Sequence, residues 1–155
     1  MKKKIYLILV LSFNLYKANA QVPTHLWANS TGSAGYDEAK KIAIDYSGNT
    51  YITGYFTGTA DFDPSVGIAN LTSAGDSDIF VAKYNSSGAY QWAINVGGTG
   101  SDVALAIVID KLNNLLITGY FKSLLIDFDP GPGTANFSPS GTDFLLQNMI
   151  LRVII

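Results

Sequence analysis

The chain repeats itself with a period of 65 residues, and this repeat restricts its fold more than any other feature of the sequence. Thirty aligned pairs run from Trp27–Phe56 onto Trp92–Phe121, and fifteen of these pairs are identical. The identities end in a shared block, Ile-Thr-Gly-Tyr-Phe, which begins at Ile52 and again at Ile117. Self-similarity at such a period is typical of proteins built from stacked or radially arranged units. We therefore expect two equivalent structural units.

The repeat continues beyond this block with small changes of spacing. One inserted residue brings Asp-Phe-Asp-Pro at 61–64 onto the same four residues at 127–130. A later deletion restores the period, so that Asp78 corresponds to Asp143. The chain after residue 20 then divides into a short linker at 21–26, a first repeat at 27–91 and a second repeat at 92–155.

Each repeat consists of short apolar runs between turn signals, which predicts strands. Ala104–Asp110 is apolar at nearly every position, as in a strand that is covered on both faces. Gly48 and Asn49 can adopt the positive φ that a tight hairpin needs. The other predicted strands are Ile42–Asp45, Thr50–Phe56, Ile79–Tyr84, Trp92–Val96 and Leu115–Phe121. Four short antiparallel strands per unit indicate an all-β fold of β-propeller-type blades, with two repeats forming an incomplete propeller fragment.

The first twenty residues have the three parts of a secretory signal peptide. Lys2, Lys3 and Lys4 precede the apolar run at 5–13, and Ala18-Asn19-Ala20 has the small residues of a cleavage site. The run is far shorter than the roughly 20 residues that span a bilayer, so no membrane span is expected in the mature chain. We expect cleavage near Ala20 and a secreted or cell-surface protein. The alternatives are an uncleaved anchor and a buried N-terminal strand.

The composition excludes several classes of chemistry. The chain has no Cys and one His, His25, so it has no disulfide framework, no thiolate metal site and no constellation of histidines for catalysis or zinc. Without residues 1–20, six basic residues face twelve acidic ones, which gives a formal charge of −6. Such a chain has no basic patch for phosphates, which argues against nucleic acid as a partner. Eleven of the acids are Asp, a residue that favours turns.

The ordered motifs resemble a known family. Trp-Ala, Gly-Gly-x-Gly-x-Asp, Ala-x-x-Ile-Asp, Gly-Asn-x-Tyr-Ile-Thr-Gly and Asp-Ile-Phe-Val-Ala-Lys-Tyr occur here in the order seen in bacterial β-propeller repeats, the SBBP repeats. The resemblance covers nearly all of Trp27–Asp143. It implies an extracellular or cell-surface β-propeller, often within a large multidomain protein. It brings no shared catalytic residue and no cofactor.

Four aspartates form the candidate metal site. Asp61 and Asp63, and likewise Asp127 and Asp129, lie two positions apart, so that in a strand both carboxylates point to one face. Such oxygens suit Ca²⁺, but two carboxylates supply few of the six to eight oxygens that Ca²⁺ takes. Capping of a turn by Asp before Pro is the simpler role.

The other conspicuous side chains have ordinary interpretations. Asp45 and Asp110 precede turns and are expected to cap the backbone rather than to act as an acid or base. Asp37 and Asp102 follow glycine-rich loops and are interpreted in the same way. Trp27 and Trp92 are expected to begin equivalent strands and to pack between blades. Carbohydrate stacking is the alternative for both tryptophans.

The C-terminal tail departs from the repeat. The first repeat predicts a strand like Asp78–Tyr84 after Asp143, but the chain continues with a different apolar sequence. A back-translated repeat strand with one deleted nucleotide encodes the observed residues 143–154. We therefore interpret Phe144–Ile155 as a frameshifted reading of a blade strand. An authentic hydrophobic terminal strand is the alternative, and the coding nucleotides decide between them.

These observations favour a non-catalytic protein. We expect a secreted β-propeller-repeat module with a binding or scaffolding role at the bacterial cell surface, within a larger protein that supplies further propeller blades. Its ligand would be a protein or a glycan. The alternative is the propeller domain of a secreted carbohydrate-active enzyme, which would need two carboxyls about 5 to 10 Å apart. Repetition of the same Asp in both units argues against that alternative, because a catalytic pair is normally unique.

Overall fold

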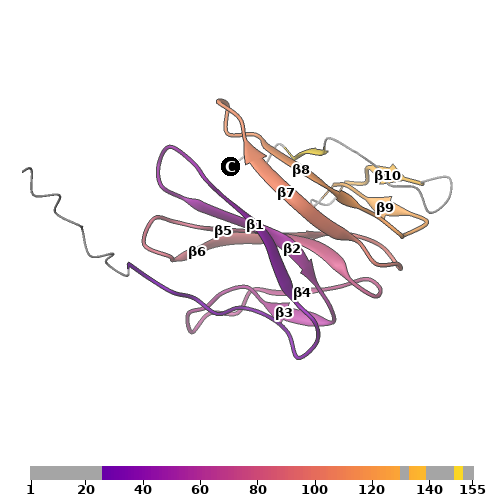
Figure 1. Ribbon diagram of the computed structural model, residues 1–155. Coiled ribbons are helices and arrows are strands. Elements are labelled where there is room, and N and C mark those ends of the chain that lie inside the picture. The colour runs from indigo at the N-terminus through magenta and orange to yellow at the C-terminus, as the bar shows by residue number, and fades with distance from the viewer. Residues whose placement is uncertain (1–25, 130–132, 139–148, 152–155) are drawn as a thin grey trace, which may run out of the picture.

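The computed structural model describes residues 26–129, 133–138 and 149–151, and its regular structure in these ranges is entirely β-strand. Two main sheets lie side by side, and a small hairpin accompanies each of them (Figure 1). The expected all-β, antiparallel fold is confirmed. The signal peptide at 1–20 and most of the tail at 144–155 lie outside the described residues, so the interpretations of those segments stay predictions.

The first sheet has four antiparallel strands in the order β1-β2-β5-β6, and the second has three in the order β11-β8-β7. The strands of the first sheet are β1 (Glu38–Ile44), β2 (Thr50–Phe56), β5 (Asp78–Tyr84) and β6 (Tyr90–Val96). Those of the second are β7 (Val103–Ile109), β8 (Leu115–Tyr120) and β11 (Met149–Leu151). The small hairpins are β3 (Thr59–Asp61) with β4 (Asn70–Thr72), and β9 (Ile126–Asp127) with β10 (Asn136–Phe137).

The sheets and the sequence repeats are out of phase. Trp92, which opens the second repeat, lies in β6, and β6 pairs with β5 to complete the first sheet. Trp27 has the same place in the first repeat but lies in no strand. The prediction that the two tryptophans begin equivalent strands is therefore wrong. The reason is topological, because no strand among the described residues precedes β1 and could pair with the Trp27 segment.

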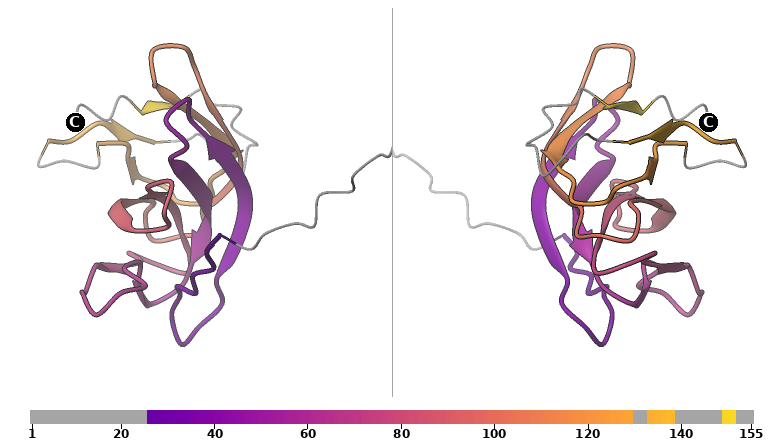
Figure 2. Two further views of the ribbon diagram at one scale, coloured as in Figure 1. Left: turned by 90° about the vertical axis from the view of Figure 1, so that its left-hand side faces the viewer. Right: turned by 90° about the vertical axis from the view of Figure 1, so that its right-hand side faces the viewer.

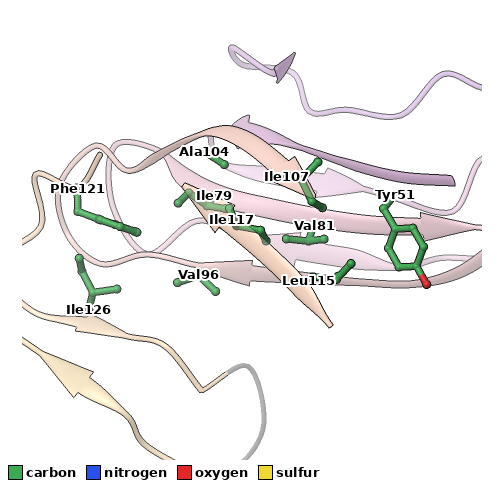
Figure 3. Close-up of a cluster of buried hydrophobic side chains, with 10 residues drawn as sticks. All are labelled: Tyr51, Ile79, Val81, Val96, Ala104, Ile107, Leu115, Ile117, Phe121 and Ile126. Atoms are coloured by element: carbon green, nitrogen blue, oxygen red, sulfur yellow. The ribbon is translucent and has the colours of Figure 1, made fainter. Parts of the chain in front are cut away.

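The interface between the two sheets, here called the seam, is the larger apolar core (Figure 3). β1 and β7 are neighbours across it. Alternate residues of each strand point into the seam, as the two-residue period of a strand requires. Its buried members are Tyr51, Ile79, Val81, Val96, Ala104, Ile107, Leu115, Ile117, Phe121 and Ile126. Both β3–β4 and β9–β10 lie at the sides of the sheets that precede them (Figure 2).

A second apolar cluster covers the opposite face of the first sheet. Phe56 packs edge-on against Phe62 with ring centroids 5.5 Å apart, and Phe62 lies 5.0 Å from Phe80. The Tyr84 hydroxyl donates a buried hydrogen bond of 2.9 Å to the Phe62 carbonyl oxygen. These aromatic contacts hold the β3–β4 hairpin on the sheet, since each ring buries a large apolar surface.

The strand β11 occupies in the second sheet the place of β5 in the first. Leu151 lies opposite Leu115, as Tyr84 lies opposite Thr50. Leu151 follows Tyr84 by 67 positions, two more than the period of the repeat. The end of the chain thus forms a paired strand in a displaced register. Both the frameshift hypothesis and an authentic terminal strand allow this pairing, so the hypothesis stays a prediction.

No helix among the described residues has the length and apolar character needed to cross a bilayer.

Candidate functional site

Three hairpin loops share one hydrogen-bonded frame. They are the five-residue loops 45–49, 85–89 and 110–114, which connect β1 to β2, β5 to β6 and β7 to β8. In each loop the N–H of the first residue donates to the carbonyl of the fifth at 2.9 to 3.0 Å. The N–H of the fourth residue donates to the carbonyl of the first at 2.9 to 3.1 Å. The described part of the chain therefore makes the same turn three times.

The first side chain of each loop closes this frame from inside. In all three loops one side-chain oxygen accepts two backbone N–H groups, those of the third and fifth residues. The oxygens belong to Asp45, Asn85 and Asp110, and the six hydrogen bonds measure 2.7 to 3.0 Å. A short polar side chain that binds its own backbone in this way stabilises a turn. The interpretation of Asp45 and Asp110 as backbone caps is confirmed.

Hydrogen bonding favours the ionised form of both of these loop carboxylates. Burial opposes the charge of Asp45, but hydrogen bonds from Asn49, Ser47 and Tyr51 outweigh it and lower the pKa of the carboxyl. The side-chain and backbone N–H groups of Asn114 lower the pKa of Asp110 in the same manner. A general acid needs the opposite shift. These two groups are therefore suited to holding the loops.

The fourth residue of each loop has a positive φ. Gly48 and Gly88 have φ of 80° and 81°, and Asn113 takes the same place with φ of 62°. Glycine adopts this region without strain, and Asn tolerates it better than most residues do. The sequence also suggested Asn49 for this conformation, and that suggestion is wrong. Asn49 instead donates its side-chain N–H to Asp45 at 2.8 Å.

The tips of the three loops are exposed and chemically different. The second and third residues are Tyr-Ser at 46–47, Ser-Ser at 86–87 and Lys-Leu at 111–112. A Cβ on Gly48 would lie 3.3 Å from the Cβ of Ser86, so the first two loops are neighbours. All three loops project toward the left and upper left in Figure 1. We call this surface, formed by residues 45–49, 85–89 and 110–114, the hairpin end.

Aspartates of the candidate metal site bind backbone N–H groups in both repeats. Asp61 accepts the N–H groups of Asp63 at 3.0 Å and Ala69 at 2.8 Å, and these bonds lower its pKa. Asp127 accepts those of Asp129 at 2.9 Å and Ala135 at 2.8 Å, with the same effect on its pKa.

The second aspartate of the first pair also binds backbone, since Asp63 accepts the N–H of Ser65 at 2.9 Å. Within the described part of the chain, no three His, Cys, Asp or Glu side chains gather in a way that could hold a metal ion. The geometry thus supports loop capping by Asp61, Asp63 and Asp127. Calcium binding by Asp61, Asp63, Asp127 and Asp129 stays a prediction.

Asp37 and Asp102 accept hydrogen bonds from equivalent backbone groups, but Asp37 is exposed and Asp102 is buried. Asp102 is fully buried and accepts hydrogen bonds from the N–H groups of Gly98 at 2.9 Å and Lys122 at 3.0 Å. It also accepts the Ser123 hydroxyl at 2.6 Å. Asp37 binds the corresponding N–H groups of Ser33 and Thr57, but it is exposed. Each aspartate ties the glycine-rich loop before its hairpin to the segment just after the second strand of that hairpin.

Asp78 is a buried carboxylate, and only one of its two oxygens has hydrogen-bond partners. Its Oδ2 accepts the N–H of Ala74 at 3.1 Å and the side-chain N–H of Asn95 at 3.0 Å. Its Oδ1 has no hydrogen-bond partner in the described structure. Burial and the nearby charge of Asp102 raise the pKa of Asp78. This group destabilises its surroundings when it is ionised.

The two tryptophans lie in different surroundings. Trp92 packs against the seam, and its ring meets Tyr51 edge-on at 6.0 Å between centroids. Its expected packing role is therefore confirmed. Trp27 is half-buried and lies against Gly88, where even a Cβ would overlap the indole ring. Asn29 donates to the Gly88 carbonyl at 2.6 Å, which holds this segment to the loop 85–89.

A cavity of about 290 Å³ lies on the face of the first sheet that points away from the seam. Its walls include the segment 29–32, Ile52, Phe56, Phe80 and Tyr84. Most of these side chains belong to the aromatic cluster that holds the β3–β4 hairpin. The cavity is thus the uncovered part of an apolar sheet face.

Comparison with known proteins agrees with this architecture. Residues 28–63 match the family described as "Beta-propeller repeat". The chain carries a β-propeller repeat. The match covers the glycine-rich loop with Asp37, the hairpin β1–β2 and the start of the Asp-Phe-Asp-Pro loop. The first sheet is accordingly a four-stranded propeller blade, and the second sheet contributes three strands of the next blade.

Two curated relatives also match this propeller sequence. The chain is 30% identical over 127 residues to an uncharacterized WD repeat-containing protein of Acanthamoeba polyphaga mimivirus. It is 28% identical over 116 residues to the regulatory protein FlaEY of Caulobacter vibrioides. These matches cover 73% and 75% of this chain but only 9% and 12% of the relatives. No solved structure matches the chain.

Sequence reasoning did not single out two features of these blades. The frame shared by the three hairpin loops was visible as Asp or Asn at the first position of each loop, and as an identical spacing to the next strand. The unsatisfied carboxylate of Asp78 had no such signal. Asp78 and Asp102 both follow glycine-containing loops, and only the packing of the two blades separates a satisfied carboxylate from an unsatisfied one.

Replacing Asp78 by asparagine should stabilise the blades increasingly as the pH rises. The folded-state pKa is raised, so the folded chain holds this proton more tightly than the unfolded chain does. The stability contributed by the protonated carboxyl is complete below the unfolded pKa of about 4 and is lost as the pH passes the folded pKa. Asparagine keeps an acceptor for Ala74 and carries no charge.

Thermal unfolding of wild type and Asp78→Asn at pH 4, 5.5 and 7 measures this effect. We expect the melting temperature of the variant, relative to wild type, to increase across the series. A difference that stays constant or shrinks with pH would show that Asp78 is not ionised at a cost to the fold.

Proposed function

We propose that this chain is a secreted β-propeller module with a non-catalytic binding role at the bacterial cell surface. Its blades would form part of a larger protein and present a ligand-binding surface for a protein or a glycan. The N-terminal sequence with its lysines, apolar run and Ala-x-Ala site supports export. The presence of two repeats supports a longer propeller, because rings need about four to eight blades.

The observation that carries the binding role is the hairpin end. Its three loops have identical hydrogen-bonded frames, which fix their backbones. Their exposed tips differ in every loop, with an aromatic hydroxyl, two small hydroxyls, and a cation beside an apolar group. Variable side chains on rigid, repeated loops are the usual arrangement of a recognition surface. Tyr46 and Leu112 are the exposed large hydrophobic side chains of this surface.

The aspartates support a structural role for the acidic residues. Asp37 and Asp102, and likewise Asp61 and Asp127, bind equivalent backbone groups in the two repeats. A carboxylate that acts in catalysis is needed once, at one bound substrate, whereas a carboxylate that closes a turn is needed in every repeat. This pattern favours a scaffold over a carbohydrate-active enzyme.

Binding of the full chain to a panel of immobilised polysaccharides and to blotted bacterial envelope proteins tests the proposal. We expect a bound ligand whose affinity falls about tenfold or more in Tyr46→Ala or Leu112→Ala. Val66→Ala is the matched control, because Val66 is fully exposed on the β3–β4 loop, away from the hairpin end. Equal affinity in all variants would rule out the hairpin end. Polysaccharide turnover that is lost in Asp127→Asn but retained in Asp61→Asn would instead establish an enzyme.

A further inference from the structure

The seam shows how one blade of this chain recognises the next. On the first blade, Ala43 and Tyr51 are paired across β1 and β2 and face the seam. On the second blade, Ile107 and Ile117 are paired across β7 and β8 and face them. The contact therefore joins the seam side of one repeat to the opposite side of the following repeat.

The described part of the chain presents both halves of this contact a second time, each facing away from the seam. Ile42 and Ile52 precede Ile107 and Ile117 by one period and are paired in the same way. Ile42 is 56% exposed, and the cavity of about 290 Å³ adjoins this face. We call this the leading face.

The complementary surface lies at the other end of the molecule. Val108 and Leu116 follow Ala43 and Tyr51 by one period and are paired across β7 and β8. Val108 is 57% exposed, since it points away from the seam. We call this the trailing face. The leading and trailing faces thus repeat the two sides of the seam at the two ends of the described structure.

The strand count gives a second, independent indication. The second blade has three described strands, and β11 forms its edge. In the first blade the corresponding edge, on β5, is covered by β6 with Trp92. The segment 27–31 matches β6 in the repeat and lies in no strand. This segment has the sequence of the strand that would complete the second blade, but it lies at the opposite end of the molecule, beside the leading face.

We propose that a second copy of this chain docks head to tail, with its trailing face on the leading face, in the place that a further blade would take in the larger protein proposed above. Ile42 and Ile52 of one copy then contact Val108 and Leu116 of the next, as the seam residues do. The segment 27–31 of the first copy extends the β11 edge of the second. Burial of these apolar side chains provides the driving force. Because the two surfaces differ, the contact is heterologous and adds further copies until a ring closes.

Sedimentation of the full chain over a range of concentrations tests this assembly. Wild type should self-associate, and Ile42→Glu and Val108→Glu should each weaken association at least tenfold, because each places a charge in the apolar contact. Val66→Glu is the control, since Val66 is 104% exposed and lies outside both faces. Circular dichroism verifies that each variant is folded. Ile44→Glu, which also alters the exposed leading face, replaces Ile42→Glu if that variant fails to fold.

Mixing the two single variants separates a head-to-tail contact from all others. Ile42→Glu retains a trailing face and Val108→Glu retains a leading face, so the mixture should form a 1:1 heterodimer and grow no further. A monomeric wild type would overturn the proposal. So would self-association that both substitutions leave intact, or a mixture that forms no heterodimer. The outcome does not depend on the ligand-binding role proposed above, because no ligand is present in this experiment.

Discussion

Replacing Asp102 by alanine is expected to lower the free energy of unfolding by about 3 kcal/mol or more. The carboxylate is completely buried and accepts the backbone N–H groups of Gly98, Lys122 and Ser123 together with the Ser123 hydroxyl. Alanine leaves these donors buried without partners, and each such group costs about 1 to 3 kcal/mol. Urea unfolding followed by circular dichroism measures the loss.

Asp37→Ala is the matched control for this prediction. Asp37 lies one period earlier and binds the corresponding backbone groups, but its surroundings are exposed, so water can replace the lost acceptor. We expect the loss of stability to be much smaller than for Asp102→Ala. Equal losses at both positions would show that burial in the seam does not determine the contribution of this aspartate.

Much of the fold could be predicted because the repeat is a local signal. Strand alternation, the turn residues and the Asp at the start of each hairpin act over a few neighbouring positions, and all of them appear twice in the sequence. The hairpins β1–β2 and β7–β8 formed close to the expected residues for this reason. The capping roles of Asp45 and Asp110 followed from the same short-range chemistry.

The different strand pairing of the Trp27 and Trp92 segments could not be predicted, because pairing depends on which strand lies beside each segment. The two tryptophans occupy identical places in the repeat, yet only Trp92 has a preceding β5 to pair with among the described residues. A repeat identifies which segments are equivalent but does not identify the boundary of a blade. The structure places that boundary after β6, between Val96 and Val103.

The aspartates that cap loops could be predicted from the sequence, but the partners of the buried aspartates could not. Asx residues before turns identify capped loops without any tertiary information. The difference between Asp102, which is fully satisfied, and Asp78, which is half satisfied, arises from groups far away in the chain. Lys122 and Ser123 meet Asp102 only because β8 returns beside β7, whereas Asp78 Oδ1 lies where a Cβ on Gly97 would be and meets no hydrogen-bond donor in the described structure.

The second large effect is expected from Gly54→Ala, at the centre of the repeated Ile-Thr-Gly-Tyr-Phe block. Gly54 lies in the inner strand β2, between Ala39 of β1 and Phe80 of β5. A Cβ at this position would overlap the carbonyl oxygen of Glu38, beside the irregularity in register between Ala39 and Lys41. Backbone cannot rotate away as a side chain can, so β1 must move. We expect a loss of about 3 kcal/mol in the free energy of unfolding.

Gly58→Ala separates this steric effect from the general cost of replacing glycine. Gly58 has φ of 65°, and no atom lies within 4 Å of the place that a Cβ would occupy, so alanine there meets only the strain of the left-handed region. That strain is worth about 1 kcal/mol. Urea unfolding of both variants should therefore rank Gly54→Ala well above Gly58→Ala. Gly119 repeats the geometry of Gly54, because its Cβ would overlap the carbonyl oxygen of Val103. If Gly54→Ala unfolds at the same urea concentration as wild type, the close approach of two strands at the bulge is not the reason why both repeats have glycine at this position.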